Sequence, residues 1–353
     1  MTSSKPEVEL SVIVSTRNRA KQLATLIQCL GSQKNLENLR WEIIIVDNSS
    51  TDNTKEVAYA FCEGSNLKIN YVFEPKTGLS NARNTGVLAS KGSYLMFVDD
   101  DVLIPNEFIS NALFGMQEHP EFQIFGFRVL ADWQEVLRAP FWVTFKKPLN
   151  LPINIIQSFL PVHDLGNEPL QYPNRIAKNP IGACFLVKKE VFEKLGPFRE
   201  DLGAGQSGLC EDTEFFWWAM INSFKILYWP YATLYHTVTP ERLTVSHLHK
   251  WYFNLGKSLY LIKRKGRIIN HLKNSNGKLL KSESSELKKL ITNLKSHASS
   301  PGSQIPILWF KLLILILFLP FSTVLLLIKR PFYLSTLIVK NLGEMKQTVI
   351  TKE

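Results

Sequence analysis

The sequence predicts an α/β fold in which helices cover both faces of a doubly wound, mostly parallel sheet. Short apolar runs rich in Ile, Val and Phe alternate with segments of helical spacing over the first part of the chain. Strands that alternate with helices imply right-handed crossovers between parallel strands. The 353 residues are 45% hydrophobic and 20% charged, which is enough apolar material for a sizeable core.

Four apolar, β-prone runs are predicted to be buried strands, at residues 10–15, 41–46, 69–73 and 94–98. Between them, apolar side chains recur at helical spacing. This spacing predicts helices at residues 21–33, 54–62 and 78–89.

The pattern is less regular beyond residue 106. Pro, Trp and Phe are frequent at residues 133–173, which we interpret as a long excursion over one face of the sheet. A Gly-rich loop is expected at residues 199–208. Regular elements are predicted again as strands at residues 182–187 and 225–228 and as helices at residues 189–195, 212–222 and 246–265.

Three consecutive carboxylates, Asp99, Asp100 and Asp101, follow the predicted strand at residues 94–98. Such charges repel one another strongly unless a cation neutralises them, and no Lys lies near them in the sequence. Mg²⁺ and Mn²⁺ prefer carboxylate oxygens, and open α/β sheets bind ligands at the carboxyl ends of strands. The triplet therefore predicts a divalent-metal site. The alternative is a solvated loop in which one Asp caps a helix that begins near Pro105.

Three further segments stand out, namely residues 12–19 (VIVSTRNR), 46–52 (VDNSSTD) and 78–86 (GLSNARNTG). Together with the Asp triplet and the pair Glu211-Asp212, they resemble the family 2 glycosyltransferases of GT-A fold and occur in that family's order. The three segments fit the family's first strand and nucleotide loop, its VDxSSxD segment and its GxxxARNxG helix start, respectively. The resemblance covers residues 8–249 and implies an inverting, hexosyltransferase-like enzyme that needs a metal ion and a nucleotide-sugar.

The resemblance implies a set of donor-binding residues. Asp47 would accept a hydrogen bond from the nucleotide base, although an Asx-turn within its own loop is the alternative. Arg83, in the first turn of a helix, would meet a diphosphate together with backbone amides, or would instead pair with a neighbouring carboxylate. The full set is Ser15, Thr16, Arg17, Asp47, Arg83, Asp99 and Asp100.

The metal ion that the resemblance implies is Mn²⁺ or Mg²⁺. The last Asp of the triplet, Asp101, would hold it, while Asp99 would contact the sugar-nucleotide. His236 follows a predicted strand and would be a further ligand, as a histidine is in some GT-A enzymes. A structural role is the alternative for His236.

The resemblance also assigns the chemistry. Asp212 would be the general base that takes the proton from the acceptor hydroxyl as its oxygen attacks the anomeric carbon, with no covalent intermediate. Gly182, Ala183 and Glu211 would lie in the acceptor region. For the pair Glu211-Asp212 the alternative is negative charge that complements a helix dipole.

We expect a UDP-sugar donor and a hydroxyl acceptor on a saccharide, lipid-linked or other molecule, in cell-surface polysaccharide or glycolipid synthesis. A sugar nucleotidyltransferase is one alternative, but it would carry a Gly-rich, basic phosphate loop after the first strand, and residues 15–18 are not one. A non-catalytic GT-A membrane scaffold is another. It would be expected to lose the acidic positions, which are all present.

The C-terminal part has a different composition. Of the net charge of +10, much comes from residues 257–295, where Lys and Arg far outnumber Glu283 and Glu286. The apolar residues 305–328 would make a helix of about 36 Å, enough for a hydrocarbon core of about 30 Å. Pro320 leaves two forms open, a span or a re-entrant hairpin. The predicted domains are a GT-A domain (8–250), a basic helical linker (251–304), a membrane segment (305–328) and a basic tail (329–353).

Charge and cysteine usage predict the location and partners. The basic residues precede the apolar segment, where anionic lipid headgroups would lie, so we expect an anionic membrane surface as partner and no nucleic acid. The four cysteines are scattered without metal-binding spacing, which suits a reducing compartment. The N-terminal residues lack the apolar stretch of a signal peptide. We therefore expect a membrane-associated protein whose catalytic domain is cytoplasmic.

Overall fold

The computed structural model describes residues 8–136, 160–174, 177, 179–274, 289 and 292. The chain divides into two compact units, which are described separately. The first comprises Met1–Gln206 and Glu211–Pro240, and the second comprises Ser207–Cys210 and Glu241–Glu353.

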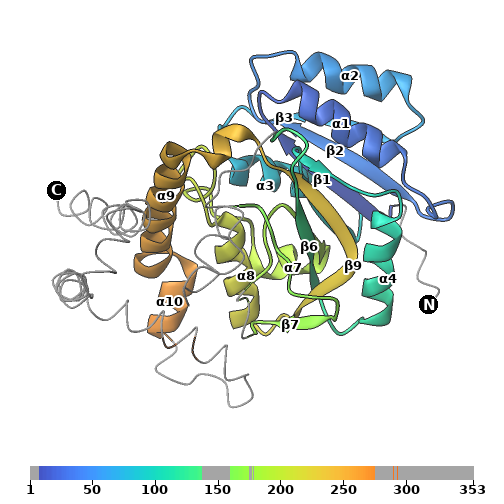
Figure 1. Cartoon of the computed structure of the whole chain (residues 1–353). Coiled ribbons are helices and arrows are strands. Elements are labelled where there is room, and N and C mark those ends of the chain that lie inside the picture. The colour runs from blue at the N-terminus through green and yellow to red at the C-terminus, as the bar shows by residue number, and fades with distance from the viewer. Residues whose placement is uncertain are drawn as a thin grey trace, which may run out of the picture. The chain divides into compact units, whose positions relative to one another are not determined.

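The first unit begins with the predicted parallel strands. Strands β3, β2, β1 and β4 lie side by side in that order and run in one direction. Figure 1 shows α1 and α2 next to β1–β3. These elements confirm the predicted α/β order, with bounds of β1 Leu10–Thr16, α1 Ala20–Gly31, β2 Trp41–Asp47, α2 Thr54–Gly64, β3 Ile69–Phe73, α3 Leu79–Ala89 and β4 Tyr94–Asp99.

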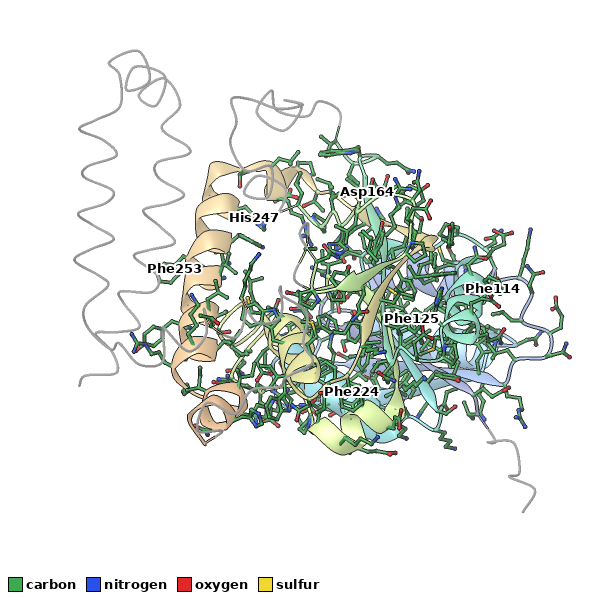
Figure 2. The ribbon with its side chains drawn as sticks, turned by 90° about the horizontal axis from the view of Figure 1, so that it is seen from below. Phe114, Phe125, Asp164, Phe224, His247 and Phe253 are labelled. Atoms are coloured by element: carbon green, nitrogen blue, oxygen red, sulfur yellow. The ribbon has the colours of Figure 1, made fainter. Side chains whose placement is uncertain are left out.

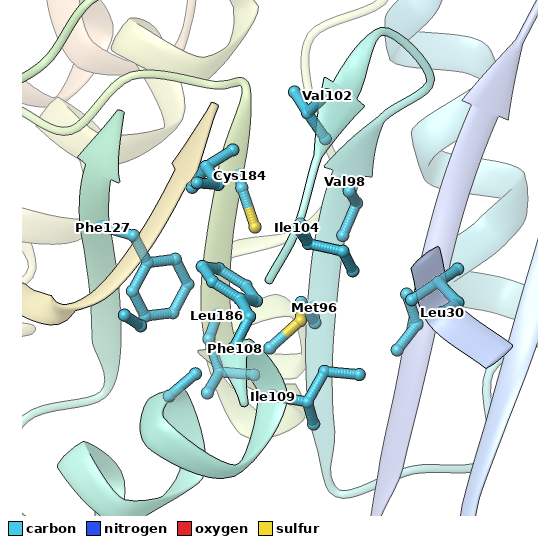
Figure 3. Close-up of a cluster of buried hydrophobic side chains, with 14 of the residues drawn as sticks. Leu30, Met96, Val98, Val102, Ile104, Phe108, Ile109, Phe127, Cys184 and Leu186 are labelled. Atoms are coloured by element: carbon cyan, nitrogen blue, oxygen red, sulfur yellow. The ribbon is translucent and has the colours of Figure 1, made fainter. Parts of the chain in front are cut away.

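Helices cover both faces of this sheet because neighbouring side chains in a strand point to opposite faces. On one face, Leu26 of α1 and Val12 of β1 belong to the same buried cluster as Phe108 of α4 (Phe108–Glu118). Figure 3 shows Phe108 and Ile109 of α4 next to Met96 of β4. Figure 2 shows Phe114 on α4, where its side chain is exposed.

The opposite face of β1 packs on α3. A Cβ added to Gly86 of α3 would lie 2.4 Å from Ile13 Cγ2, so only glycine permits this close approach. Further along the sheet, α7 (Lys189–Leu195) and α8 (Glu211–Ile221) cover this face with an aromatic cluster. Phe216 of α8 lies 5.1 Å from Phe185 of the sheet, ring centroid to centroid.

The second part of the sheet adds antiparallel strands to the predicted, mostly parallel order. Strand β8 runs antiparallel to β4 and to β6, whereas β6 and β9 are parallel to each other. The order continues from β4 as β8-β6-β9-β5, and β7 pairs with β9. The bounds are β5 Val102–Leu103, β6 Ile124–Asp132, β7 Leu170–Tyr172, β8 Cys184–Lys188 and β9 Ile226–Thr237.

Strand β9 is much longer than the predicted strand at residues 225–228. Pro230 interrupts its sequence pattern, since proline cannot donate to a strand ladder. In the structure the pairing with β6 shifts at this point, so that Phe127 is opposite Trp229 but Arg128 is opposite Thr233. This irregularity absorbs Pro230 and lets β9 continue to His236.

The second unit contains the helices α9 (Val245–Arg264) and α10 (Arg267–Asn274). Thr244 caps α9 by accepting a hydrogen bond from the His247 amide at 3.1 Å. Figure 2 shows Phe253 on α9. Residue 250, the predicted end of the GT-A domain, lies inside α9. The predicted domain limits stay predictions.

Among the described residues, no helix has the length and apolar character that a membrane crossing requires. The predicted membrane segment at residues 305–328, the basic tail and most of the linker lie outside the described residues.

Candidate active site

The predicted site residues gather where the parallel strands β1, β2 and β4 end. Ser15 is level with Asp99 across β1 and β4, and Thr16 is level with Asp47 across β1 and β2. Since parallel strands present their carboxyl ends at one edge, this register brings residues far apart in the sequence together.

Two arginines pair with the Asp triplet. Nη1 of Arg19 donates to Asp100 Oδ1 at 2.6 Å and to Asp101 Oδ2 at 2.8 Å. Nη2 of Arg83 donates to Asp99 Oδ1 at 3.0 Å. Sequence reasoning missed Arg19 because it lies far from the triplet along the chain. The available signal was its place just after β1, the strand next to β4.

Asp100 is held by the protein itself. Its carboxylate is buried and accepts a hydrogen bond from Thr16 Oγ1 at 2.7 Å, in addition to the bond from Arg19. Burial raises the pKa of Asp100 to about 6, while the nearby Arg19 charge acts in the opposite direction. The donor-binding roles of Thr16 and Asp100 stay predictions.

Asp99, Asp101 and His236 form a group that can hold a metal ion. One ligand atom of each lies within 4.8 Å of the others. Burial and the carboxylates of Asp101 and Asp100 raise the pKa of Asp99 to about 7, and Arg83 opposes this shift. The structure thus brings together the two predicted ligands, Asp101 and His236, and adds Asp99, which was expected to contact the donor.

The hydrogen bonds of His236 favour a cation beside it. Nδ1 lies 3.1 Å from the Thr237 carbonyl oxygen, which can only accept, so Nδ1 carries a proton. Nε2 then faces Asp101 Oδ1 at 3.2 Å. A neutral imidazole would direct a lone pair at a carboxylate oxygen, and a proton or a metal ion removes this repulsion. The two carboxylates are ligands that Mn²⁺ and Mg²⁺ prefer, and the imidazole adds a nitrogen ligand.

Arg83 connects the two acidic parts of the site. The residue is 2% exposed, and its guanidinium donates to Glu211 Oε1 at 2.8 Å and to the Gly182 carbonyl oxygen at 2.9 Å as well as to Asp99. Its guanidinium carbon also lies 5.9 Å and 5.8 Å from the ring centroids of Phe185 and Phe198. The ion-pair alternative for Arg83 is therefore present, and its direct contact with a diphosphate stays a prediction.

Glu211 and Asp212 differ in their surroundings. Glu211 is buried, and this burial together with the charge of Asp212 raises the pKa of Glu211 to about 7. Asp212 is partly exposed, and its Oδ1 accepts a hydrogen bond from the Thr213 amide at 2.6 Å. A Cβ added to Gly182 would lie 2.5 Å from Asp212 Oδ2, so glycine at this position makes room for the carboxylate.

The remaining predicted acceptor residue, Ala183, joins the same edge. Its carbonyl oxygen accepts a hydrogen bond from the Asp99 amide at 2.9 Å. The segment of Gly182 and Ala183 therefore links Asp99 to Asp212 through direct contacts, and its contact with an acceptor stays a prediction.

The residues of the predicted nucleotide loop differ in exposure and in their partners. Ser15 Oγ is buried and has no hydrogen-bond partner among the residues that the structure describes, whereas Arg17 is exposed. Asp47 Oδ1 accepts from the Ser50 amide at 2.8 Å, and Oδ2 accepts from the Tyr71 hydroxyl at 2.8 Å. The Asx-turn alternative for Asp47 is thus present, and its contact with a nucleotide base stays a prediction.

Two backbone amides at the start of α3 have partners within the protein, and a contact of this helix turn with a diphosphate stays a prediction. The Gly78 amide donates to Asn48 Oδ1 at 2.7 Å, and the Leu79 amide donates to the Ala204 carbonyl oxygen at 2.9 Å. Ala204 belongs to the Gly-rich loop. Residues 203–208 of this loop read GAGQSG and have GxGxxG spacing, but they follow α7 rather than a strand, so they are not a dinucleotide fingerprint.

A sequence profile described as glycosyl transferase family 2 matches residues 11–196, more than half of the chain. The chain belongs to this family. The five quoted segments had indicated this membership.

Three named relatives match different shares of the chain. TarS, a poly(ribitol-phosphate) β-N-acetylglucosaminyltransferase of Staphylococcus aureus, is 30% identical over 32% of this chain and 19% of its own length. AglE, a glycosyltransferase of Haloferax volcanii, is 37% identical over 29% of this chain and 32% of its own length. TuaG of Bacillus subtilis, a putative teichuronic acid biosynthesis glycosyltransferase, is 26% identical over 56% of this chain and 77% of its own length. The matched part is thus about a fifth of TarS and a third of AglE.

Solved structures confirm that the fold is GT-A-like. The mannosyltransferase PcManGT of Pyrobaculum calidifontis, in complex with GDP-Man and Mn²⁺, aligns with a TM-score of 0.61 over 99% of this chain and 89% of that one, at 17% identity. S. aureus TarS 1-349 in complex with UDP-GlcNAc aligns with a TM-score of 0.52 over 82% of this chain and 72% of that one, at 18% identity. At these low identities, the likeness to the two solved structures shows only that the folds are similar.

Proposed function

We propose that this glycosyltransferase is an inverting, metal-dependent enzyme that transfers a sugar from a nucleotide-sugar, in the first place a UDP-sugar. The acceptor would be a hydroxyl of a saccharide or lipid-linked molecule in cell-surface polysaccharide or glycolipid synthesis. The observation that carries the proposal is the group of Asp99, Asp101 and His236, whose ligand atoms lie within 4.8 Å of one another. TarS, whose name refers to poly(ribitol-phosphate), and TuaG, whose name refers to teichuronic acid biosynthesis, support a polymer acceptor.

Asp99, Asp101 and His236 would hold Mn²⁺ or Mg²⁺. When bound, such an ion stabilises the negative charge of a departing nucleoside diphosphate. The neighbouring PcManGT and TarS structures contain GDP-Man with Mn²⁺ and UDP-GlcNAc, respectively, which supports the donor class but leaves the base to experiment.

We assign the role of general base to Asp212. Glu211 is buried and its Oε1 accepts a hydrogen bond from Arg83, whereas Asp212 is partly exposed beside Gly182. Asp212 would take the proton of the acceptor hydroxyl while the hydroxyl oxygen forms a bond to the anomeric carbon. The bond from that carbon to the diphosphate oxygen breaks in the same step, so the anomeric configuration inverts.

The test is a screen of UDP-, GDP- and dTDP-sugars for binding and slow hydrolysis by the purified chain in the presence of Mn²⁺. We expect one nucleotide class, UDP, to bind clearly more tightly than the other two. NMR of the transfer product with the active donor then reads the anomeric configuration. Retention of configuration would contradict single displacement, and absence of binding by all three classes would contradict a nucleotide-sugar donor.

We further propose that the catalytic domain lies at the cytoplasmic face of a membrane. The support is compositional, namely the basic residues 257–295 ahead of the apolar residues 305–328. Each basic residue near an anionic surface contributes on the order of 1 kcal/mol to attachment.

A further inference from the structure

Arg19 has a contact pattern that the proposed reaction does not explain. A single nitrogen, Nη1, bridges Asp100 Oδ1 at 2.6 Å and Asp101 Oδ2 at 2.8 Å. The Arg19 side chain is 41% exposed, but those of Asp100 and Asp101 are only 5% and 12% exposed. A solvent-accessible cation thus covers two largely buried carboxylates.

The backbone of Arg19 is fixed while its side chain has room to move. Its amide donates to Thr54 Oγ1 at 3.3 Å, and its carbonyl oxygen accepts from the Leu23 amide in α1 at 2.9 Å. Rotation about the long Arg side chain can therefore release the carboxylates without any change in the sheet or in α1.

The Arg19 contact conflicts with a divalent ion on the same carboxylate. Asp101 Oδ2 accepts from Arg19, and Asp101 Oδ1 faces His236 Nε2 at 3.2 Å. Two cations that share one carboxylate at contact distance repel each other strongly where solvent access is small. A metal ion that binds Asp101 must therefore weaken or break the bond from Arg19.

Building on the proposed metal-dependent reaction, we propose that Arg19 is an internal counter-ion that competes with the divalent cation for Asp101 and is released when a nucleoside diphosphate binds. A diphosphate supplies the oxygens that a guanidinium binds best, so it offers Arg19 a new partner as the metal ion takes the carboxylate. Metal and nucleotide then strengthen each other's binding, and this coupling is reciprocal. Arg19 acts here as a positioning residue rather than a catalytic one.

The test measures Mn²⁺ binding to the full chain by electron paramagnetic resonance of the free ion, with Mn²⁺ alone and with saturating UDP or GDP. Arg19→Gln should bind Mn²⁺ alone about tenfold more tightly than the wild type, because no ion pair has to be broken. With nucleotide present this advantage should disappear, and the variant should bind the nucleotide more weakly. The control variant, Lys21→Gln, removes an equal charge at an exposed position of α1 and should leave Mn²⁺ binding unchanged.

Loss of Arg19 leaves the buried Asp100 carboxylate with one fewer partner, which can impair folding. If Arg19→Gln does not fold, the same comparison is made in an Asp100→Asn background, where no such charge is left behind. Arg19→Gln should again tighten binding of Mn²⁺ alone relative to Asp100→Asn by itself.

The outcomes separate the two proposals. In one outcome the wild type binds Mn²⁺ in the presence of nucleotide, but Arg19→Gln binds Mn²⁺ alone no more tightly than the wild type does. This result would overturn the competing role of Arg19 and leave the metal-dependent function standing. Absence of Mn²⁺ binding in every variant, with and without nucleotide, would overturn both.

Discussion

At the scale of single residues, two neighbouring carboxylates in the same helix turn have different environments. Glu211 is buried against Arg83, and Asp212 is partly exposed beside Gly182. The sequence grouped them as one acidic pair. The family resemblance already assigned the base role to Asp212, and the structure adds a physical difference, because Arg83, which lies far from both along the chain, binds Glu211.

Replacing Asp212 by Asn keeps the size and hydrogen-bonding groups of the side chain but removes its proton affinity. We expect Asp212→Asn to bind donor normally while transfer falls by about 10²–10⁴-fold. Steady-state transfer rates and donor titrations measure the two effects. Asp201→Asn, at an exposed carboxylate paired with Arg199, is the control and should stay near wild type. A near-normal transfer rate in Asp212→Asn would exclude Asp212 as the base.

Arg83 is expected to matter for stability, since Asp99 and Glu211 both depend on it. Arg83→Met keeps the length of the side chain but leaves buried carboxylate oxygens without their donor, and such a loss costs about 3–5 kcal/mol. Chemical denaturation measures the free energy of unfolding. Arg128→Met breaks the more exposed pair with Asp164 and should cost about 1 kcal/mol or less. Equal losses in the two variants would contradict the central place of Arg83.

At the scale of elements, the first four strands were predictable because each is a short apolar run bounded by polar residues. The long β9 was not, since Pro230 breaks its pattern and the irregular pairing with β6 that absorbs it depends on a distant strand. Strand β6 was missed for a related reason. Gly126 and Arg128 interrupt its apolar run, and Gly126 is needed because a Cβ there would lie 2.5 Å from Pro180 Cβ.

The candidate site was predictable to the extent that strand ends could be located. The ends of β1, β2 and β4 placed the Asp triplet and Asp47 at one edge, and His236 was suggested by its family resemblance. What the sequence could not provide were side-chain partners. Arg19 on Asp100 and Asp101 depends on the register between β1 and β4, and no local pattern records it.

The segment before β8 sets the position of Asp212, which gives a test at the element scale. In Gly182→Ala the new Cβ would lie 2.5 Å from Asp212 Oδ2, so the carboxylate must move. We expect a kcat reduced by at least about tenfold with the donor KM retained, because geometry at the reacting atoms changes while the donor pocket does not. Gly64→Ala, where a Cβ meets nothing within 4 Å, should have no effect. Wild-type kcat in Gly182→Ala would contradict the placement of Asp212.

At the scale of the whole molecule, the catalytic fold and the proposed membrane attachment belong to different parts of the chain. Truncation after about residue 300 removes the apolar residues 305–328 but keeps most of the basic linker. We expect a more soluble enzyme whose binding to anionic vesicles weakens as salt is raised, since surface charges are screened. Vesicle co-sedimentation measures this. Salt-independent binding of the truncated chain would contradict an electrostatic role of the linker.

The form of the attachment can be read separately. Labelling of single cysteines introduced beyond residue 340 distinguishes a span from a re-entrant hairpin. Labelling only from the non-cytoplasmic side would establish the span, and labelling from the cytoplasmic side the hairpin.

The central claim is that a divalent ion on Asp99, Asp101 and His236 is required for transfer. The most direct measurement is the transfer rate of the purified enzyme with its active nucleotide-sugar, in Mn²⁺ and after removal of metal by EDTA, for wild type and Asp101→Ala. We predict that EDTA abolishes wild-type transfer, that Mn²⁺ restores it, and that Asp101→Ala is inactive in both conditions while remaining folded. Full turnover of the wild type in EDTA would contradict the claim.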